Sequence, residues 1–211
     1  MLTSALGKSV GDVMAALAEK FDYLSIEDYL AGEKISEIRH EYVDGQVYAM
    51  AGGSLKHNLI AANISGLLWS HLRGTSCVPL SSDMLLKTLG KRFRYPDVVV
   101  VCDDDASDDD QIRESPILII EVLSKSTRKK DKGEKRLEYL AIPSLLEYVL
   151  IEQDFAEVEV QRRSASWQSA YYFLGDEVVL ESVNATLPVE AIYERVKNDD
   201  VLAWLEQQQA G

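Results

Sequence analysis

The sequence lacks the features that mark membrane, disulfide-rich and zinc proteins. No apolar run is long enough to span a bilayer, and the opening residues MLTSALGKSV contain no uninterrupted apolar stretch typical of an export signal. Only two cysteines occur, Cys77 and Cys102, with neither a CxxC pair nor a zinc-ligand spacing. We therefore expect a cytoplasmic protein with no membrane partner, whose two thiols are reduced and inert.

Positive charge is also scarce. The 22 Lys and Arg residues are outnumbered by 35 Asp and Glu residues, which gives a formal net charge of −13. This balance argues against a protein that coats nucleic acid non-specifically, because such binding depends on a basic surface. The phosphate-binding motifs GxxxxGK[ST] and GxGxxG are absent. The length of 211 residues, with 46% hydrophobic residues, suits one soluble globular domain with a substantial core.

The charges are segregated along the chain. The run DDDASDDD, residues 103–110, supplies six negative charges in what we expect to be a solvated loop. Residues 125–136 contain seven basic and two acidic residues, and residues 87–94 contain four basic residues and no acidic one. These two positive segments flank Asp97 and Glu121, each of which adjoins a run of four apolar residues. Two acids in such similar settings suggest a common role.

Apolar periodicity and turn residues predict a mixed sheet with helices packed against it. The buried strands should lie within residues 93–101 and 116–123, and a four-strand meander should follow over 145–182. The other expected elements are a helix over 9–20, a hairpin that turns at Asp44-Gly45, a helix that begins at Ser54, a helix that stops before Pro143, and short helices near 188–196 and 199–208.

An antiparallel pairing of the two buried strands would bring the two acids together. With Val101 opposite Ile117, partner numbers sum to 218 and Asp97 lies opposite Glu121. Opposed carboxylates repel each other, whereas a bound divalent cation makes the same pair favourable. Pro96 suits the start of such a strand, because it need not donate a ladder hydrogen bond. The alternative is that both acids are exposed strand-end residues paired with Lys or Arg.

Four stretches resemble the Uma2 family of endonucleases in the order that the family shows. They are HEYVDGQVYAMAGGSLKHNLIAANI, YPDVVVV, IIEVLSKSTRKKDKGEKRLEYL and EYVLIE. The resemblance covers roughly residues 23–196 and implies a relationship to PD-(D/E)XK nucleases. It implies an α/β fold, namely a restriction-endonuclease-like mixed β-sheet flanked by helices. Residues 1–22 would then be an N-terminal helical extension, and residues 197–211 a C-terminal helical tail.

The resemblance also implies the acidic site residues. Asp97 resembles the acid of the PD half-motif, Glu121 resembles the acid of (D/E)XK, and Glu41 resembles a further acid often found before the core. His57 matches a histidine common in the family and is a candidate to orient a carboxylate or contact phosphate. Asp83 is a candidate acid at the edge of the site. For His57 and Asp83 the alternatives are a helix-cap role and a turn role.

One residue departs from the family pattern. The lysine that usually follows the second acid by two positions is replaced by Leu123. That lysine positions or deprotonates the attacking water and offsets negative charge. Lys125 keeps the alternation of Glu121 if the strand continues, whereas Lys135 lies one helical turn after Asp131. We favour Lys135, because its spacing resembles the family pattern; phosphate contact or a solvated helix face is the alternative for either lysine.

These features predict a metal-dependent endonuclease that hydrolyses phosphodiester bonds in nucleic acid, with DNA favoured. Asp97 and Glu121 would hold Mg²⁺ (magnesium) or Mn²⁺, Lys135 and Glu41 would complete the catalytic set, and the basic segments would contact phosphates. A homodimer suits an enzyme that cuts two strands. The alternatives are an inactive nuclease-fold module that binds nucleic acid or a protein, with Leu123 marking the loss of catalysis, and a structural or oligomerisation domain.

Overall fold

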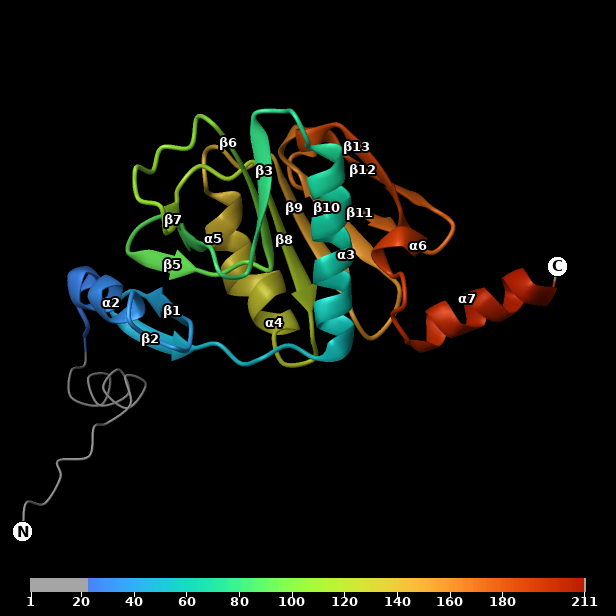
Figure 1. The fold of residues 1–211 in the computed structure, drawn as a ribbon, viewed down its shortest axis with the longest axis horizontal. Helices are drawn as coiled ribbons and strands as arrows, with labels where there is room; N and C mark the ends of the chain where they lie inside the picture. Colours follow the sequence, from blue (N-terminus) through green and yellow to red (C-terminus); the bar gives the residue numbers. More distant parts are fainter. Residues whose placement is uncertain (1–22, 211) are drawn as a thin grey trace, which may run out of the picture. The chain divides into compact units, whose positions relative to one another are not determined.

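The computed structural model describes residues 23–210, and Figure 1 shows the helices and strands that they form. The predicted extension over 1–22, with its helix at 9–20, lies outside the described residues. The chain divides into two compact units. Within the described residues, one unit contains residues 23–52 together with Gly90–Arg94, and the other contains Gly53–Leu89 together with residues 95–210. Within residues 23–210, no helix is both long and apolar enough to cross a membrane.

In its described part, from residue 23 on, the smaller unit combines one helix with a short antiparallel sheet. Its elements are α2 (Ile26–Glu33), β1 (His40–Val43), β2 (Gln46–Ala49) and β5 (Arg92–Arg94). The β1–β2 hairpin turns at Asp44 and Gly45, as the sequence predicts, and both residues have the positive φ that a tight hairpin turn requires. Tyr29, Tyr42 and Phe93 pack together, with the first two rings stacked at 4.9 Å between centroids. This aromatic core holds β1 in place.

The larger unit is built around a six-stranded mixed sheet, which confirms the predicted fold class. Its strands, in spatial order, are β11 (Ser169–Tyr172), β10 (Val158–Arg162), β9 (Glu147–Glu152), β8 (Leu118–Leu123), β6 (Val98–Cys102) and β3 (Cys77–Ser81). In this sheet β8 and β9 are parallel, and the other neighbours are antiparallel. All six residues of β8 are buried, because helices cover both of its faces.

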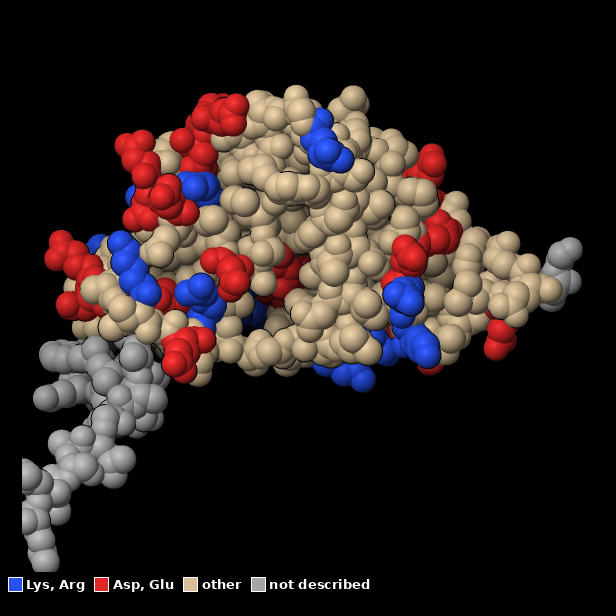
Figure 2. Space-filling model, in the orientation of Figure 1, with Lys and Arg blue, Asp and Glu red and all other residues tan. Residues whose placement is uncertain are grey.

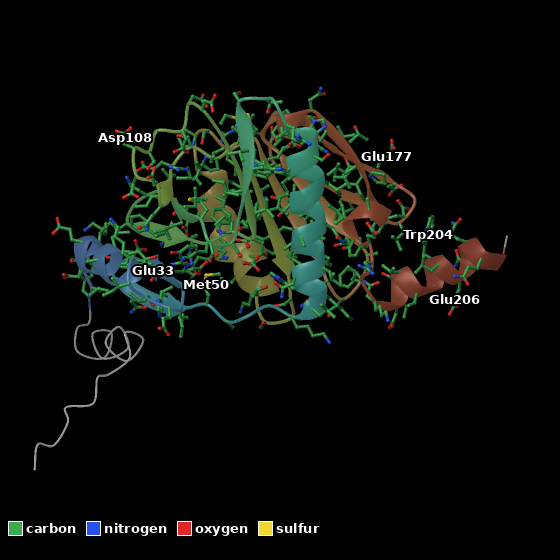
Figure 3. All side chains as sticks on the ribbon, viewed as in Figure 1. Glu33, Met50, Asp108, Glu177, Trp204 and Glu206 are labelled. Carbon is green, nitrogen blue, oxygen red and sulfur yellow. A yellow bond between two sulfur atoms is a disulfide. The ribbon has the colours of Figure 1, made fainter. Side chains whose placement is uncertain are left out.

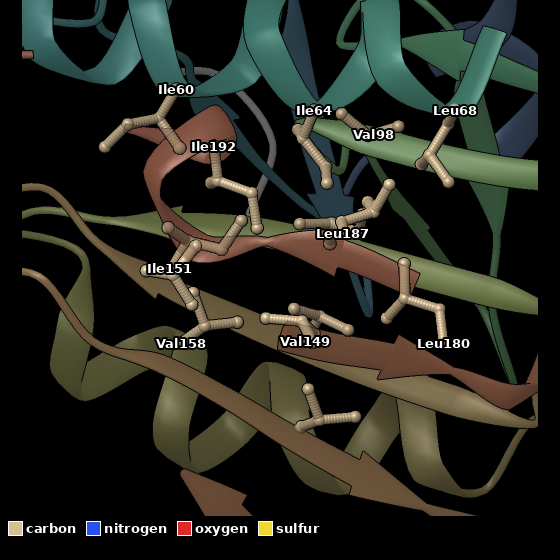
Figure 4. Packing of buried hydrophobic residues seen from close by; sticks show 14 of the residues in the cluster. Ile60, Ile64, Leu68, Val98, Val149, Ile151, Val158, Leu180, Leu187 and Ile192 are labelled. Atoms are coloured by element: carbon tan, nitrogen blue, oxygen red, sulfur yellow. The ribbon is translucent and has the colours of Figure 1, made fainter. Parts of the chain in front are cut away.

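The two faces of the sheet carry different helices. On one face, Ile60, Ile64 and Leu68 recur at helical spacing along α3 and pack on the sheet (Figure 4). On the other face, Tyr139 packs with Tyr148 and the odd-numbered apolar residues of β6 and β8. The helix predicted before Pro143 is confirmed, although its middle is a π-helical turn. The helical segments are α3 (Leu55–His71), α4 (Arg128–Lys130), the π-helical η1 (Asp131–Lys135) and α5 (Arg136–Leu140).

Short elements complete the larger unit. They are β4 (Leu85–Lys87), β7 (Ile112–Arg113), η2 (Arg163–Ala165), β12 (Glu177–Leu180), η3 (Glu181–Val183), β13 (Ala185–Pro188), α6 (Val189–Ile192) and α7 (Asp199–Ala210). Strand β12 pairs with β13 in a separate two-stranded sheet, so the predicted meander ends one strand early, at β11. The two short C-terminal helices occur where the sequence predicts them.

The acidic segment 103–110 forms the loop between β6 and β7, as expected. Most of its carboxylates are exposed, and Figure 3 shows Asp108 directed away from the ribbon. Asp105 and Asp109 are partly buried, and the side chain of Asp105 accepts hydrogen bonds from three backbone N–H groups, those of Ser107, Glu114 and Ser115. The loop is therefore largely exposed to solvent, and the hydrogen bonds of Asp105 join its two ends.

The cysteines correct one sequence-based expectation. Cys77 on β3 lies directly opposite Cys102 on β6, and the two residues form a disulfide. The prediction of two reduced thiols is therefore wrong. The cysteines are 25 residues apart in the sequence, and only the pairing of the two strands makes them neighbours. Disulfides are uncommon in a reducing cytosol, so this bond is a feature that the expected cytoplasmic location does not explain.

Candidate active site

The register of β6 and β8 is the one expected from the sequence. Val98 pairs with Ile120 and Val100 pairs with Leu118, so partner numbers sum to 218. Asp97 immediately precedes β6, and its Oδ2 accepts the backbone N–H of Val122 at 2.7 Å. This hydrogen bond holds the Asp97 carboxylate beside the end of β8 that carries Glu121. Strand pairing therefore places the two acids near each other. Neither acid is exposed, as the alternative required, although Glu121 does pair with a lysine, as that alternative also held.

A histidine from α3 contacts the first acid. Ser54 caps the N-terminus of α3 by accepting the N–H of His57 at 3.2 Å, which sets the position of the first helical turn. His57 Nε2 lies 3.1 Å from Oδ2 of Asp97, and both side chains are mostly buried. The hydrogen bond that His57 donates to the Asp97 carboxylate raises the pKa of His57, although burial acts in the opposite direction. His57 is thus placed to orient a carboxylate, as one of its two sequence-based roles requires.

The second acid lies deeper in the protein. Glu121 is 3% exposed, and its Oε1 accepts hydrogen bonds from Lys135 Nζ at 2.9 Å and from the Tyr139 hydroxyl at 3.0 Å. Burial raises the pKa of Glu121 to about 8. The ammonium of Lys135 lowers that pKa, and the negative charge of Asp97 raises it further. Such a carboxyl takes up a proton readily unless a cation compensates its charge.

The structure distinguishes the two candidate lysines. Strand β8 ends at Leu123, which is fully buried in the hydrophobic core, so the strand alternation that suggested Lys125 does not continue. Lys125 is exposed in the loop after β8. Lys135 reaches Glu121 from the π-helical turn η1, on the face of the sheet opposite α3. The ammonium group beside Glu121 therefore comes from a helix, and the side chain of Leu123 packs in the hydrophobic core.

A further buried acid was not among the expected site residues. Asp131, at the start of η1, is 3% exposed and lies 3.5 Å from Nζ of Lys135. Burial raises the pKa of Asp131, and Lys135 opposes this shift. The Asp-x-x-x-Lys spacing was the available signal, because residues four apart share a helix face. The spacing that favours Lys135 therefore also indicates Asp131 as its neighbour on the helix.

The other two expected acids lie in different settings. Glu41, on β1 of the smaller unit, is 4% exposed and its Oε2 accepts a hydrogen bond at 3.0 Å from Arg94, which is fully buried. Asp83 is exposed in the turn between β3 and β4, which fits the turn alternative. Glu41 is therefore paired with a buried guanidinium, and its role in the chemistry stays a prediction; Asp83 is a turn residue.

The two basic segments are engaged mainly with acids of the protein itself. Figure 2 accordingly shows Lys and Arg in small separate groups on the visible face, several of them beside Asp and Glu. Lys125 and Lys129 remain exposed and are the better candidates for phosphate contact. The internal pairs are Lys87 with Glu114, Arg92 with Asp44, Arg94 with Glu41, Arg128 with Glu152, Lys132 with Glu159, and Lys135 with Glu121.

The two acids fit a hard divalent cation. Among the described residues, no group of three or more His, Cys, Asp and Glu side chains is arranged to hold a metal ion. Mg²⁺, however, commonly takes only one or two protein carboxylates and completes its shell with water and substrate phosphate oxygens. Both contacts of Asp97 involve Oδ2, and those of Glu121 involve Oε1. The donor set therefore suits Mg²⁺ or Mn²⁺ and argues against a zinc centre built from protein ligands alone.

A substitution at Gly53 tests how His57 is positioned. A Cβ added at Gly53 would lie 2.7 Å from Nδ1 of His57, so Gly53→Ala should push the imidazole away from Asp97. The pKa of His57 should then fall toward its ordinary value, because the hydrogen bond that His57 donates to Asp97 raises it. NMR titration of the imidazole protons measures this change. Gly52→Ala is the matched control, since a Cβ there meets no described atom within 4 Å; an unchanged pKa in Gly53→Ala would contradict the contact.

Two relatives of known sequence resemble the chain over most of their own length. Both come from Synechocystis sp. (strain ATCC 27184 / PCC 6803 / Kazusa). The uncharacterized protein slr1290 is 35% identical over 176 residues, which cover 82% of this chain and 93% of the relative. The uncharacterized protein sll1609 is 34% identical over 139 residues, which cover 64% of this chain and 78% of the relative.

The fold and a family model agree with these likenesses. The chain matches the crystal structure of a putative nuclease belonging to DUF820 from Anabaena variabilis with a TM-score of 0.68. The match covers 82% of this chain and 99% of that one, and its 17% identity makes it a likeness of fold. Residues 26–190 match the model of the Uma2 family, described as "Putative restriction endonuclease". Because that match spans most of the chain, this protein belongs to the Uma2 family.

Proposed function

We propose that this protein is a metal-dependent endonuclease that hydrolyses phosphodiester bonds in nucleic acid, with DNA as the favoured substrate. The observation that carries the proposal is the meeting of Asp97 and Glu121 at the β6–β8 pair, with the Lys135 ammonium 2.9 Å from Glu121. Two carboxylates and one lysine are the residue types that hydrolysis of a phosphodiester uses. Membership of a family described as restriction endonucleases points to the same chemistry.

The two acids would hold Mg²⁺ or Mn²⁺, which supplies a Lewis acid that polarises the phosphate and lowers the pKa of a bound water. The residues around them have separate tasks. The Val122 N–H and His57 hold the Asp97 carboxylate in one orientation, and the Tyr139 hydroxyl does the same for Glu121. Fixed ligands need no reorganisation during the reaction.

Lys135 would offset the negative charge that develops at the reacting phosphate. Lys135 is 7% exposed and its ammonium adjoins Glu121 and Asp131, so its charge acts in a poorly screened environment. This placement argues against the inactive-module alternative, because the task of the lysine missing at position 123 can be carried out from η1. Cleavage of both strands of a duplex would use two copies of the chain, and we include a homodimer in the proposal.

The test is cleavage by the purified protein. Supercoiled plasmid DNA, linear duplex DNA and single-stranded RNA are each incubated with Mg²⁺, with Mn²⁺ and with EDTA. We expect metal-dependent nicking or linearisation of DNA, measured by gel electrophoresis. An absence of cleavage of every substrate, together with salt-dependent retention of DNA, would favour the binding-module alternative.

A matched pair of lysine variants separates the two candidates. We expect Lys135→Gln to lower the cleavage rate by about 10²-fold, because removal of one donor to transition-state charge commonly costs that much. Lys125→Gln should change the rate by less than about threefold, since its exposed side chain would contribute only a screened phosphate contact. Single-turnover kinetics at saturating Mn²⁺ measures both. Equal losses in the two variants would contradict the assignment of Lys135.

A further inference from the structure

The ammonium of Lys135 lies between two buried carboxylates. Its Nζ is 2.9 Å from Oε1 of Glu121 and 3.5 Å from Oδ1 of Asp131. All three side chains are at most 9% exposed, so these charges interact with little screening by water. Asp131 has no role in the chemistry proposed so far, and its buried carboxylate is paired with the Lys135 ammonium, as buried acids usually require.

The two carboxylates are not equivalent. Glu121 would take part in cation binding, and the incoming positive charge would then repel an ammonium that shares the same carboxylate. Lysine has a long flexible side chain, so a lysine held by Glu121 alone would be free to move away when the cation arrives. A second acid on the side of the lysine removes this difficulty, because it keeps the ammonium in place by an ion pair that the cation does not use.

The fold anchors this second acid independently of its side chain. The hydroxyl of Tyr148, a buried residue of β9, donates a hydrogen bond at 3.1 Å to the backbone carbonyl of Asp131. The Tyr148 ring also packs edge-on against Tyr139, whose own hydroxyl reaches Glu121. The π-helical turn η1 is thus tied to the sheet at the residue that faces Lys135. Single π-helical turns inside helices often occur at functional sites.

We propose that Asp131 is a positioning residue that holds the Lys135 ammonium at the reacting phosphate once Glu121 binds the cation. The proposal rests on the proposed endonuclease function. Asp131 does not touch the cation or the substrate in this assignment, and it acts only through Lys135. The rival roles are a third cation ligand and a purely structural acid.

The contact is tested first without metal or substrate. In protein labelled with ¹⁵N at lysine, an ammonium held in buried ion pairs exchanges its protons slowly and gives a resolved NH₃⁺ signal. We expect one such signal to disappear in Lys135→Gln, which assigns it, and to broaden or disappear in Asp131→Asn. It should be partly restored in Asp131→Glu, which also serves if the asparagine variant fails to fold. Asp108→Asn, in the exposed acidic loop, is the control that leaves the signal unchanged.

The role is tested by separating metal binding from turnover. We expect Asp131→Asn to keep the Mn²⁺ affinity within about threefold, measured by calorimetry, and to lower kcat by about 10- to 100-fold, the usual cost of losing an outer partner of a site. A loss of Mn²⁺ affinity as large as that of Asp97→Asn would make Asp131 a ligand and overturn the proposal. An unchanged Lys135 NMR signal in Asp131→Asn, or a kcat within twofold of the wild type, would also overturn the proposal. If the wild-type protein cleaves nothing, the endonuclease proposal fails, while the NMR result still decides whether Asp131 holds Lys135.

Discussion

Asp97→Asn is expected to abolish Mn²⁺ binding and to lower the rate of DNA cleavage by about 10³-fold or more. A bound divalent ion contributes several kcal/mol to the stabilisation of transition-state charge, and each 1.4 kcal/mol corresponds to a factor of ten in rate. Loss of one of only two carboxylate ligands removes both the charge and the geometry that retain the ion. The expected loss therefore exceeds that of the lysine and Asp131 variants.

The asparagine variant is designed to spare the fold. Its amide oxygen can still accept the N–H of Val122, the hydrogen bond that ties Asp97 to β8. We expect the far-UV circular dichroism spectrum to be unchanged and the thermal midpoint to shift little. Calorimetric titration with Mn²⁺ and a plasmid cleavage assay measure the two losses, with Asp108→Asn as the control of equal charge change. Wild-type Mn²⁺ affinity in Asp97→Asn would refute the cation site.

Glu121→Gln is expected to abolish activity while making the protein more stable at mildly alkaline pH. Burial raises the pKa of Glu121 from 4.5 to about 8, so the folded state holds this proton more tightly than the unfolded chain does. The stability that this carboxyl contributes is fully present below about pH 4.5 and is lost as the pH rises toward 8. Glutamine has nearly the same shape and does not titrate. The free energy of unfolding of the variant, relative to the wild type, should therefore increase as the pH rises toward 8.

Urea unfolding at about pH 5 and about pH 8 measures this effect. We expect the two proteins to be nearly equal at the lower pH, and the variant to exceed the wild type by about 1 kcal/mol or more at the higher pH, since one pKa unit corresponds to 1.36 kcal/mol. The measurement is made in EDTA, because a bound cation would stabilise the wild type. A variant less stable than the wild type at the higher pH would mean that the ion pair with Lys135 outweighs the cost of burial.

Much of the sheet could be predicted from local sequence. The apolar runs beside Asp97 and Glu121 identify two strands, and alternation of side chains then makes the register a choice among few options, because a slip by one residue turns a carboxylate to the opposite face. The hairpin at Asp44-Gly45 and the helix cap at Ser54 follow from turn and capping chemistry, which depends on near neighbours in the chain. These predictions depend on short-range physics and are confirmed.

The errors arose where the outcome depends on distant contacts. The disulfide of Cys77 depends on the pairing of β3 with β6, and no local pattern specifies it. The basic segments were expected to contact phosphates, yet charges such as that of Arg128 pair with acids from distant strands, here Glu152. Phosphate contact stays a prediction for the exposed Lys125 and Lys129. A linear charge count cannot distinguish a solvated cation from one that is already neutralised.

The sequence by itself determined the strand and helix types and the register that places Asp97 near Glu121, because both depend on periodicity along the chain. The preference for Lys135 over Lys125 came from resemblance to the family pattern. Only the tertiary structure decided that Leu123 belongs to the core, that Lys135 reaches Glu121 across the sheet face, and that Asp131 shares its ammonium. The reason is physical: burial and the approach of charges depend on how a helix packs on a sheet, and packing is set by the whole core.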